Sequence, residues 1–299
     1  MIGPASFPTP HLALRSADEA ELTRARAFAS VQAVAAEAMR VRLTTGWRDR
    51  DTRVAQLRAA HRDLVDWRCD LASRAPGRLG IGIPQEADRF RMTIDEHGAN
   101  YDRIGYIGRL RANPVWDEST RTFRGGRSTP AHETMLEYGR EATARFAADD
   151  DVLRNPVILP GGEVLPGNSL VRGQAAMRIA NELIARIVRR QGHADNVETG
   201  GDPIYVVSAS RAARARMFAE AVDLLAAGEP EDLETWQAAR YLLYQAPITK
   251  KGSDAVTRTF LVAVGAVTLG RAPVLAQDVD LRCVVLGQDR ATRMPTDVK

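Results

Sequence analysis

One short segment combines the residue types that bind anions at the start of a helix. Pro166-Gly167-Asn168-Ser169 precedes a stretch with helical periodicity, and Arg172 falls in its expected first turn. Glycine allows a positive φ or a close backbone approach, while Asn and Ser cap helices and can bind phosphate oxygens. The unpaired N–H groups of the helix and the guanidinium fork add further donors. The segment therefore indicates an anion-binding turn, with a plain helix start as the alternative.

The elements on either side of this turn are predicted from local patterns. Apolar runs at 157–159 and 164–165 flank the turn Pro160-Gly161-Gly162, which favours a β-hairpin. Residues 170–190 carry an apolar face at helical spacing. A buried strand at 204–207 and a helix that begins after Ser208 or Ser210 and ends at Gly228 follow.

The rest of the chain is predicted to be helical at both ends. Residues 18–43 and 52–73 have apolar residues three or four apart and a short connection, so they should form an antiparallel helical hairpin. Alternating side chains predict a strand at 89–98, a second strand is expected at 103–110, and residues 120–130 should form a basic loop. Helices are expected at 131–147, 231–245 and 255–269. The predicted domains are a helical hairpin at 1–80, an α/β domain at 81–228 and a helical region at 229–299.

The charge pattern of the 299 residues suits anionic partners. The net charge is only +3, but nearly all basic residues are Arg, because Lys occurs only at 250, 251 and 299. Arg grips phosphate bidentately. The candidate DNA contacts lie on the second helix, in the loop at 249–253 and just after it: Arg53, Arg58, Arg62, Lys250, Lys251 and Arg258. A solvated helix face and a genomic preference for Arg remain the alternatives.

Several classes of protein are disfavoured. Cys69 and Cys283 match no CxxC spacing, which argues against a zinc site and a disulfide-rich secreted fold. No apolar run is long enough for a transmembrane helix, and the first residues do not look like a signal peptide, so a cytoplasmic location and no membrane partner are expected. The P-loop, nucleophile-elbow and dinucleotide-binding motifs are also missing.

The order of elements between 106 and 227 resembles the ParB/sulfiredoxin-like fold, which includes partition-protein CTPases and free-serine kinases. YIGRLRANP carries Ile107, Leu110, Asn113 and Pro114 in the family's "I..L..NP" pattern, and RNPVILPGGEVLPGNSLVRGQA stands where the family has its "PVVV.DG.IL.G..R" strand pair. The resemblance implies an α/β (α+β) fold with a mixed sheet, and a nucleoside triphosphate held by the segment from Gly167 to Gly173.

The sequence departs from the family pattern within that segment. It keeps Gly167 and Arg172, but Asn168, Ser169 and Leu170 replace Glu, Arg and Arg, and Pro166 replaces the Asp of the similar DGQHR variant. The resemblance implies nucleotide contacts from Gly167, Asn168, Ser169, Arg172 and Asn113, and the loop residues Arg124 and Arg127 should close over the ligand. Glu220 matches the acid of the family's metal motif, but Ala221 replaces its Asn, which weakens the expected Mg²⁺ site.

A second resemblance lies in ITKKGSDAVTRTFLVAVGAVTLG, which is similar to the phosphate-binding loop and helix of Fic-type nucleotidyl transferases. Gly252, Ser253, Asp254 and Arg258 would cradle the phosphates, but Thr249 stands near the place of the catalytic His. Without that base the usual chemistry is lost.

Three functions are therefore carried forward. The first is a DNA-associated, ParB-like protein that binds a nucleoside triphosphate with Mg²⁺ and whose status as an NTPase is left open. The second is a non-enzymatic DNA-binding regulator, and the third is a degenerate Fic-type transferase. The expected partners are a nucleotide, DNA and a second copy of the chain.

Overall fold

The computed structural model describes residues 1–74, 87–96 and 98–294, so the expected domain boundary at 80/81 and His97 lie outside the described residues. The chain begins with two short 3-10 helices, η1 (Pro4–Ser6) and η2 (His11–Ala13). Helices α1 (Glu19–Gly46) and α2 (Arg50–Arg74) then form the predicted helical hairpin. Asp18 starts α1 because its side chain accepts a hydrogen bond from the Glu21 N–H at 3.0 Å.

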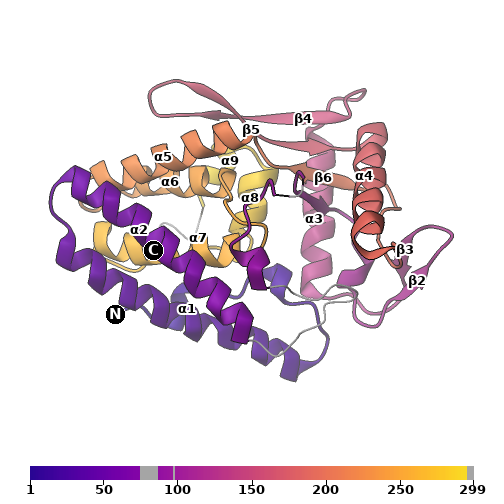
Figure 1. Ribbon diagram of the computed structural model, residues 1–299, viewed down its shortest axis with the longest axis horizontal. Helices are drawn as coiled ribbons and strands as arrows, with labels where there is room; N and C mark the ends of the chain where they lie inside the picture. Colours follow the sequence, from indigo (N-terminus) through magenta and orange to yellow (C-terminus); the bar gives the residue numbers. More distant parts are fainter. Residues whose placement is uncertain (75–86, 97, 295–299) are drawn as a thin grey trace.

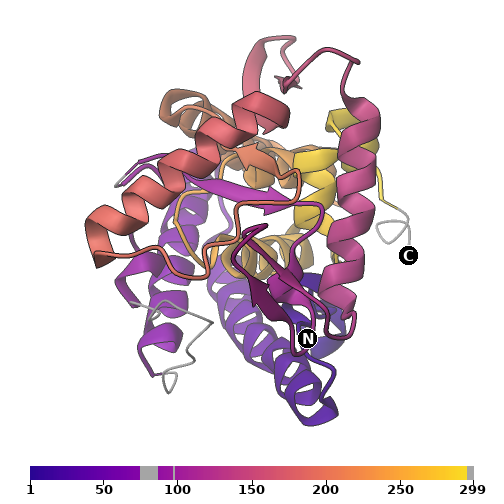
Figure 2. The ribbon, with the colours of Figure 1, turned by 90° about the vertical axis from the view of Figure 1, so that its right-hand side faces the viewer.

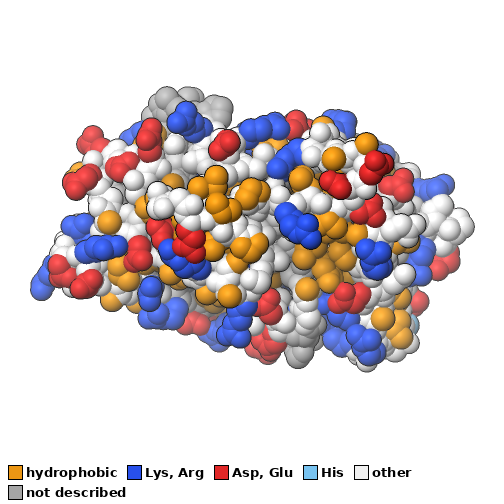
Figure 3. Space-filling model, turned by 90° about the horizontal axis from the view of Figure 1, so that it is seen from above, with side chains coloured by type: hydrophobic (Ala, Val, Ile, Leu, Met, Phe, Trp, Pro, Cys, Tyr) orange, Lys and Arg blue, Asp and Glu red, His pale blue; other side chains and the backbone are white. Residues whose placement is uncertain are grey.

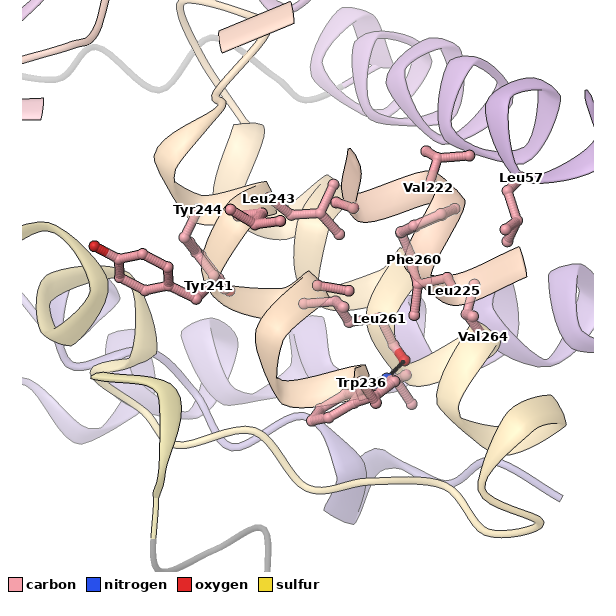
Figure 4. Packing of buried hydrophobic residues seen from close by; sticks show 14 of the residues in the cluster. Leu57, Val222, Leu225, Trp236, Tyr241, Leu243, Tyr244, Phe260, Leu261 and Val264 are labelled. Carbon is pink, nitrogen blue, oxygen red and sulfur yellow. Dashed lines mark hydrogen bonds between the residues drawn. The ribbon is translucent and has the colours of Figure 1, made fainter. Parts of the chain in front are cut away.

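The hairpin packs on helices from the second half of the chain, which form the left part of the molecule in Figure 1. These helices are α5 (Arg211–Ala227), α6 (Leu233–Gln245) and α7 (Ser253–Thr268). Helix α7 is the most apolar of them, and Figure 4 shows Phe260, Leu261 and Val264 packed among side chains of the neighbouring helices. The three helices confirm the predictions for this region because their periodic apolar faces meet in one core.

A four-stranded sheet occupies the right part of Figure 1, with the order β1-β6-β5-β4. Its strands are β1 (Tyr101–Ile104), β4 (Val152–Ile158), β5 (Val164–Val171) and β6 (Ile204–Val207). All three pairings are antiparallel, so the mixed sheet expected from the sequence is wrong. Helix α4 (Gly173–Gln191) joins β5 to β6, and the long segment 192–203 after it returns the chain so that β6 runs against β5.

Helices cover both faces of this sheet, as Figure 2 shows. Ile204, Val206 and Leu170 face α3 (Pro130–Arg145) and α8 (Val279–Val285). The alternate residues Tyr205 and Val171 pack against α4. Side chains alternate between the two faces of a strand. The continuous apolar run at 204–207 is therefore explained by burial of both faces of the sheet at β6. The molecule is therefore an α+β fold with a helical hairpin before the sheet and a helical part after it.

Several predicted elements differ from the structure. Residues 87–90 form the 3-10 helix η3 (Ala87–Phe90), and within the described residues of the expected strand at 89–98 only Thr93 makes a bridge, to Thr249. The expected strand at 103–110 is split into β1 and the 3-10 helix η4 (Gly108–Leu110). The expected loop at 120–130 contains β3 (Thr122–Arg124), which pairs with β2 (Val115–Asp117). The short helices α8 and α9 (Gln288–Thr292) were not predicted.

The outer surface combines polar helices with an apolar hairpin. None of the helices within the described ranges is long and apolar enough to cross a membrane. The β4–β5 hairpin lies on the upper side of the molecule, where Figure 3 shows hydrophobic side chains among charged ones. Ile158 and Val164, which face each other across the hairpin, are 51% and 62% exposed.

Candidate functional site: a basic cluster before helix α7

The predicted anion-binding turn at 166–169 is not a turn. Pro166, Gly167, Asn168 and Ser169 all lie within β5, and α4 begins only at Gly173, with Arg172 at its N-cap and no side-chain cap. Ser169, Leu170 and Val171 pair with β6 on one side, and with β4 on the other. Pairing with β4 and β6 provides hydrogen bonds for backbone groups that would be unpaired at the start of a helix. The segment is therefore a strand and not the predicted turn.

Asn168 belongs to a buried network of amides that joins the sheet to the C-terminal helices. Its Nδ2 donates to the Val284 carbonyl at 2.8 Å, and its Oδ1 accepts from Asn155 Nδ2 at 3.1 Å. Its backbone N–H donates to Gln245 Oε1 at 3.0 Å, and Gln245 Nε2 donates to the Cys283 carbonyl at 2.7 Å. The side chain that the sequence assigned to phosphate is therefore 3% exposed and fully used in holding α8 against β5.

Gly167 and Arg172 also have structural partners. A Cβ at Gly167 would lie 2.6 Å from the Asn155 carbonyl oxygen, so glycine is needed there for strand packing. The Arg172 guanidinium donates to the carbonyl oxygens of Ala147 and Asp150 at 2.8 and 2.9 Å, and it lies over the ring of Phe146. It thus ties the segment after α3 to the start of α4.

The other predicted nucleotide contacts lie around the β2–β3 hairpin. Asn113 has a positive φ of 55°, Arg124 pairs with Asp117 at 3.0 Å, and the Arg127 backbone pairs with Ala112. Among the residues that the structure describes, no hydrogen bond or ion pair connects Asn113, Arg124 or Arg127 with Gly167, Asn168, Ser169 or Arg172. Nucleotide binding by these residues remains a prediction.

The predicted DNA contacts are divided between the surface and the core. Arg58 and Arg62 are exposed on α2, whereas Arg53 donates to the Ala226 carbonyl at 3.2 Å and lies over the Trp47 ring. Arg258 is 1% exposed and cannot reach DNA, so that assignment is wrong. Its helical spacing from Asp254 decides its role, since Arg258 Nε donates to both carboxylate oxygens of Asp254 at 2.9 and 3.0 Å.

The proposed metal ligand Glu220 is likewise engaged by a neighbour. Arg216, one helical turn away, donates to Glu220 Oε2 at 2.7 Å. Nowhere in the described ranges do three or more His, Cys, Asp or Glu side chains gather as a metal site. The Mg²⁺ prediction therefore has no support from Glu220.

The loop before α7 is held in a defined shape. The Ile94 N–H donates to the Ile248 carbonyl at 2.9 Å and the Lys250 N–H donates to the Met92 carbonyl at 3.0 Å, so segment 92–94 lies beside the loop. Gly252 has φ +78°, and an added Cβ would lie 2.7 Å from the Phe90 ring. Only glycine fits this left-handed position.

Helix α7 begins directly after this loop and has no side-chain cap, because Gly252 occupies its N-cap. Its first-turn N–H groups carry the positive end of the helix dipole. Asp254 lies in the same turn, but Arg258 and the Tyr244 hydroxyl, which donates to Asp254 Oδ1 at 3.0 Å, satisfy its carboxylate. The loop and the helix end therefore offer a positively polarised surface.

Arginines from three other segments lie within electrostatic range of the two lysines of this loop. Burial lowers the pKa of the Lys251 ammonium although solvent still reaches the side chain, and neighbouring cations lower it further. A pKa lowered by burial and an exposed side chain are compatible when solvent reaches the ammonium from one side only. We call these cations and the two lysines the basic cluster, which consists of Arg15, Arg89, Arg109, Lys250 and Lys251.

The cluster contains few compensating carboxylates. Asp102, on edge strand β1, raises the Lys251 pKa, and Glu96 has the same effect on Lys250. No carboxylate of the described chain lies within ion-pair distance of Lys250, Lys251 or Arg109. In contrast, Arg216 on α5 pairs with two glutamates at 3.0 and 2.7 Å. Lys250, Lys251 and Arg109 therefore have no ion pair among the described residues, unlike Arg216.

A buried glutamate fixes the part of the cluster that comes from η4. Glu198 is 4% exposed, and its carboxylate accepts from the N–H groups of Gly108 at 2.7 Å and Arg109 at 3.3 Å. The buried Arg103 donates to the Glu198 carbonyl at 3.0 Å. This arrangement positions the Arg109 backbone while its side chain is exposed.

Arg258 pairs with Asp254 and also lies within electrostatic range of a second carboxylate, Asp280 on α8. Burial raises the pKa of Asp280 to about 7, and the nearby charge of Asp254 contributes in the same direction. Asp280 Oδ1 is buried and without a hydrogen-bond partner in the described structure. Burial without a hydrogen-bond partner therefore favours the protonated form of this carboxyl.

Only the lysines of the basic cluster were singled out from the sequence. Arg15, Arg89 and Arg109 come from separate segments with no shared motif, so only the fold brings them into range of the lysines. The chain matches no protein-family model, and no curated protein matches it.

Proposed function

We propose that this chain binds the phosphate groups of a nucleotide, with a nucleoside triphosphate as the first candidate, at the basic cluster before α7. The observation that carries the proposal is that Lys250 and Lys251 stand directly before an uncapped helix start and within electrostatic range of three arginines. Helix N-termini and Arg or Lys side chains are the groups that proteins use for phosphate. The site thus differs from the segment 167–172 that the sequence indicated.

The lowered pKa values of the basic groups support an anion as the ligand of this site. Burial is the main cause that lowers the pKa values of Lys250, Lys251 and Arg15, and repulsion from neighbouring cations lowers them further. A bound phosphate would relieve this repulsion and raise the Lys251 pKa. Affinity should therefore fall as the pH rises through the Lys251 pKa, because the ammonium loses its charge.

The ParB-like assignment and the link to DNA are part of this proposal. The β4–β5 hairpin and β6 lie in one sheet, as that resemblance requires. The basic groups around Lys250 also continue to Arg186 and Arg190 of α4. This extension favours a second candidate function, contact with the phosphate backbone of DNA. A DNA backbone carries more phosphates than one nucleotide and can contact more of these cations at once.

Thermal shifts of the purified chain test the first proposal. ATP, CTP and GTP are added with and without Mg²⁺ to the wild type and to Lys251→Gln. A ligand that binds the native state at about 100 times its Kd adds about 2.7 kcal/mol of stability. We expect at least one nucleotide to raise the Tm of the wild type and to lose this effect in Lys251→Gln. The exposed Arg58→Gln on α2 removes one charge elsewhere and should keep the full shift.

The DNA candidate has its own readout. Duplex binding measured at several salt concentrations should weaken steeply, since each neutralised phosphate contributes a slope of about −0.9 in log K against log salt. Lys250→Gln should reduce this slope. A flat slope would contradict phosphate contacts altogether, and a slope that changes only in Arg58→Gln would place the contact outside the basic cluster.

A further inference from the structure

Helix α1 has two apolar faces. Ala33, Ala36, Met39 and Leu43 point into the core, where α1 packs on α7 and α2. The opposite face lies at the lower edge of the molecule in Figure 1, with no other helix below it. A surface helix normally carries polar residues on its outer face, so the apolar outer face requires a separate explanation.

The exposed apolar residues follow a regular spacing. Val34 is 73% exposed, Val41 51% and Val31 39%, and the positions between and beyond them hold alanines, one threonine and, between Ala20 and Ala27, the exposed Arg24. We call this stripe the outer seam, and it consists of Ala20, Ala27, Val31, Val34, Ala38, Val41 and Thr45. From Ala27 to Thr45 the steps alternate between four and three residues, which is the spacing of a coiled-coil seam.

We infer that the outer seam pairs with the outer seam of a second copy of this chain, in an antiparallel, two-fold symmetric arrangement. The seam extends over about 38 Å of helix at 1.5 Å per residue. Its small side chains permit the helix axes to approach to about 8 Å. An isologous contact of this kind closes on itself and produces a dimer.

Charge complementarity selects the register. When Val31 lies opposite Val34 of the second copy, Ala20 lies opposite Thr45, and Glu21 flanks Arg42 of the second copy on both sides of the two-fold axis. Glu21 and Arg42 have side chains 55% and 53% exposed, and within the chain they pair with Arg24 at 3.7 Å and with Asp63 at 2.5 Å, so the contact between copies competes with these exposed pairs. A register shifted by one heptad would instead place Glu37 beside Glu37 of the second copy, which is unfavourable.

A parallel pairing fits the charges less well. It would place Arg24, which stands at one seam position, against its own counterpart in the second copy. A favourable ion pair in the parallel arrangement would need Glu37. That carboxylate already accepts hydrogen bonds from Arg40 at 2.9 and 2.8 Å and from the Ile2 N–H at 3.0 Å. In the antiparallel pairing Arg24 lies against Val41, and the two helix dipoles oppose each other favourably.

Disulfide trapping tests the arrangement, because the native Cys69 and Cys283 are buried. Ala20→Cys and Thr45→Cys are prepared separately and mixed before mild oxidation. The antiparallel pairing predicts a crosslink between the two variants and none within either variant alone. Crosslinks that form only within each variant would overturn it in favour of a parallel pairing, and no crosslink together with a monomeric mass would overturn the dimer itself.

Sedimentation velocity gives the second measurement. We expect a concentration-dependent species of twice the 32.7 kDa monomer that is lost in Val34→Arg. Val115→Arg, at a site 71% exposed outside the seam, should keep the dimer. Glu21→Arg should weaken the dimer and Glu21→Arg with Arg42→Glu should restore it, a result that does not depend on how Val34→Arg folds. A dimer unaffected by Val34→Arg, or no rescue by the double variant, contradicts the proposal.

Discussion

The buried His61 should make the stability of this protein depend on pH. It lies on α2 and is 6% exposed, with the rings of Phe218 and Phe260 at centroid distances of 5.0 and 5.5 Å. Burial among these side chains lowers the pKa of His61 from 6.5 to about 4, because the charged imidazolium loses its hydration. Lowering the pH from neutral towards 4 should therefore destabilise the folded chain through His61.

The direction and size of the effect follow from the two pKa values. The unfolded chain takes up a proton at His61 as the pH falls below 6.5, whereas the native chain resists until about 4. The stability that this residue contributes is complete above pH 6.5 and is lost as the pH falls towards the folded-state pKa. A difference of about 2.5 pH units corresponds to about 3 kcal/mol at 1.36 kcal/mol per unit.

Urea unfolding from about pH 7.5 to about pH 4.5 measures this loss in the wild type and in His61→Phe. The variant has no proton to take up at this position, so its free energy of unfolding should fall by about 2.5 kcal/mol less than that of the wild type. Carboxylates titrate equally in both proteins and cancel in the comparison. Parallel curves for the two proteins would refute the reasoning.

Two further predictions concern the loop and the amide network. Gly252→Ala should destabilise the chain by about 2 kcal/mol in urea unfolding, since a left-handed alanine is strained and its Cβ meets the Phe90 ring, and it should also weaken nucleotide binding. Asn168→Ala should cost about 2 to 3 kcal/mol because buried partners lose their hydrogen bonds, whereas Ser169→Ala next to it should cost less than about 0.5 kcal/mol. Equal losses for these two variants would contradict the structural role of Asn168.

The long helices were predictable because their signals are local, whereas the short α8 and α9 were not. Asp18, Thr129 and Ser210 each accept a hydrogen bond from the third residue of the segment after them, and the apolar stripes behind them are regular. Gly192, with φ 82°, ends α4 in the same local way. Caps and periodicity can be read without knowing what the helix packs on.

The strands were harder to predict because their partners are distant in sequence. Pro166-Gly167-Asn168 has the composition of a turn, but pairing of the following residues with β6 extends β5 to Val171. Conversely, Phe90, Met92 and Ile94 alternate like a strand, although the buried Phe90 lies in a 3-10 helix and the buried Ile94 lies in a turn.

The residues of the candidate site also divide into those that the local sequence indicates and those that only the fold brings together. Lys250 and Lys251 stood out because lysine is rare in this chain, and their loop before a helix was predicted correctly. The remaining members of the basic cluster depend on the packing of segments that are far apart in sequence. Arg258 had the right spacing for a phosphate ligand, but the same spacing gave it an internal partner in Asp254.

Isothermal titration calorimetry of a nucleoside triphosphate with the wild type, the double variant Lys251→Gln/Arg109→Gln and the Arg58→Gln control tests the central claim most directly. A hydrogen bond to a charged group contributes about 1.5 to 3 kcal/mol, so each removed contact should weaken binding about tenfold or more. We predict saturable binding to the wild type and to Arg58→Gln, and its loss in the double variant. Equal affinity in all three proteins, or no heat of binding in the wild type, would contradict a phosphate site at the basic cluster.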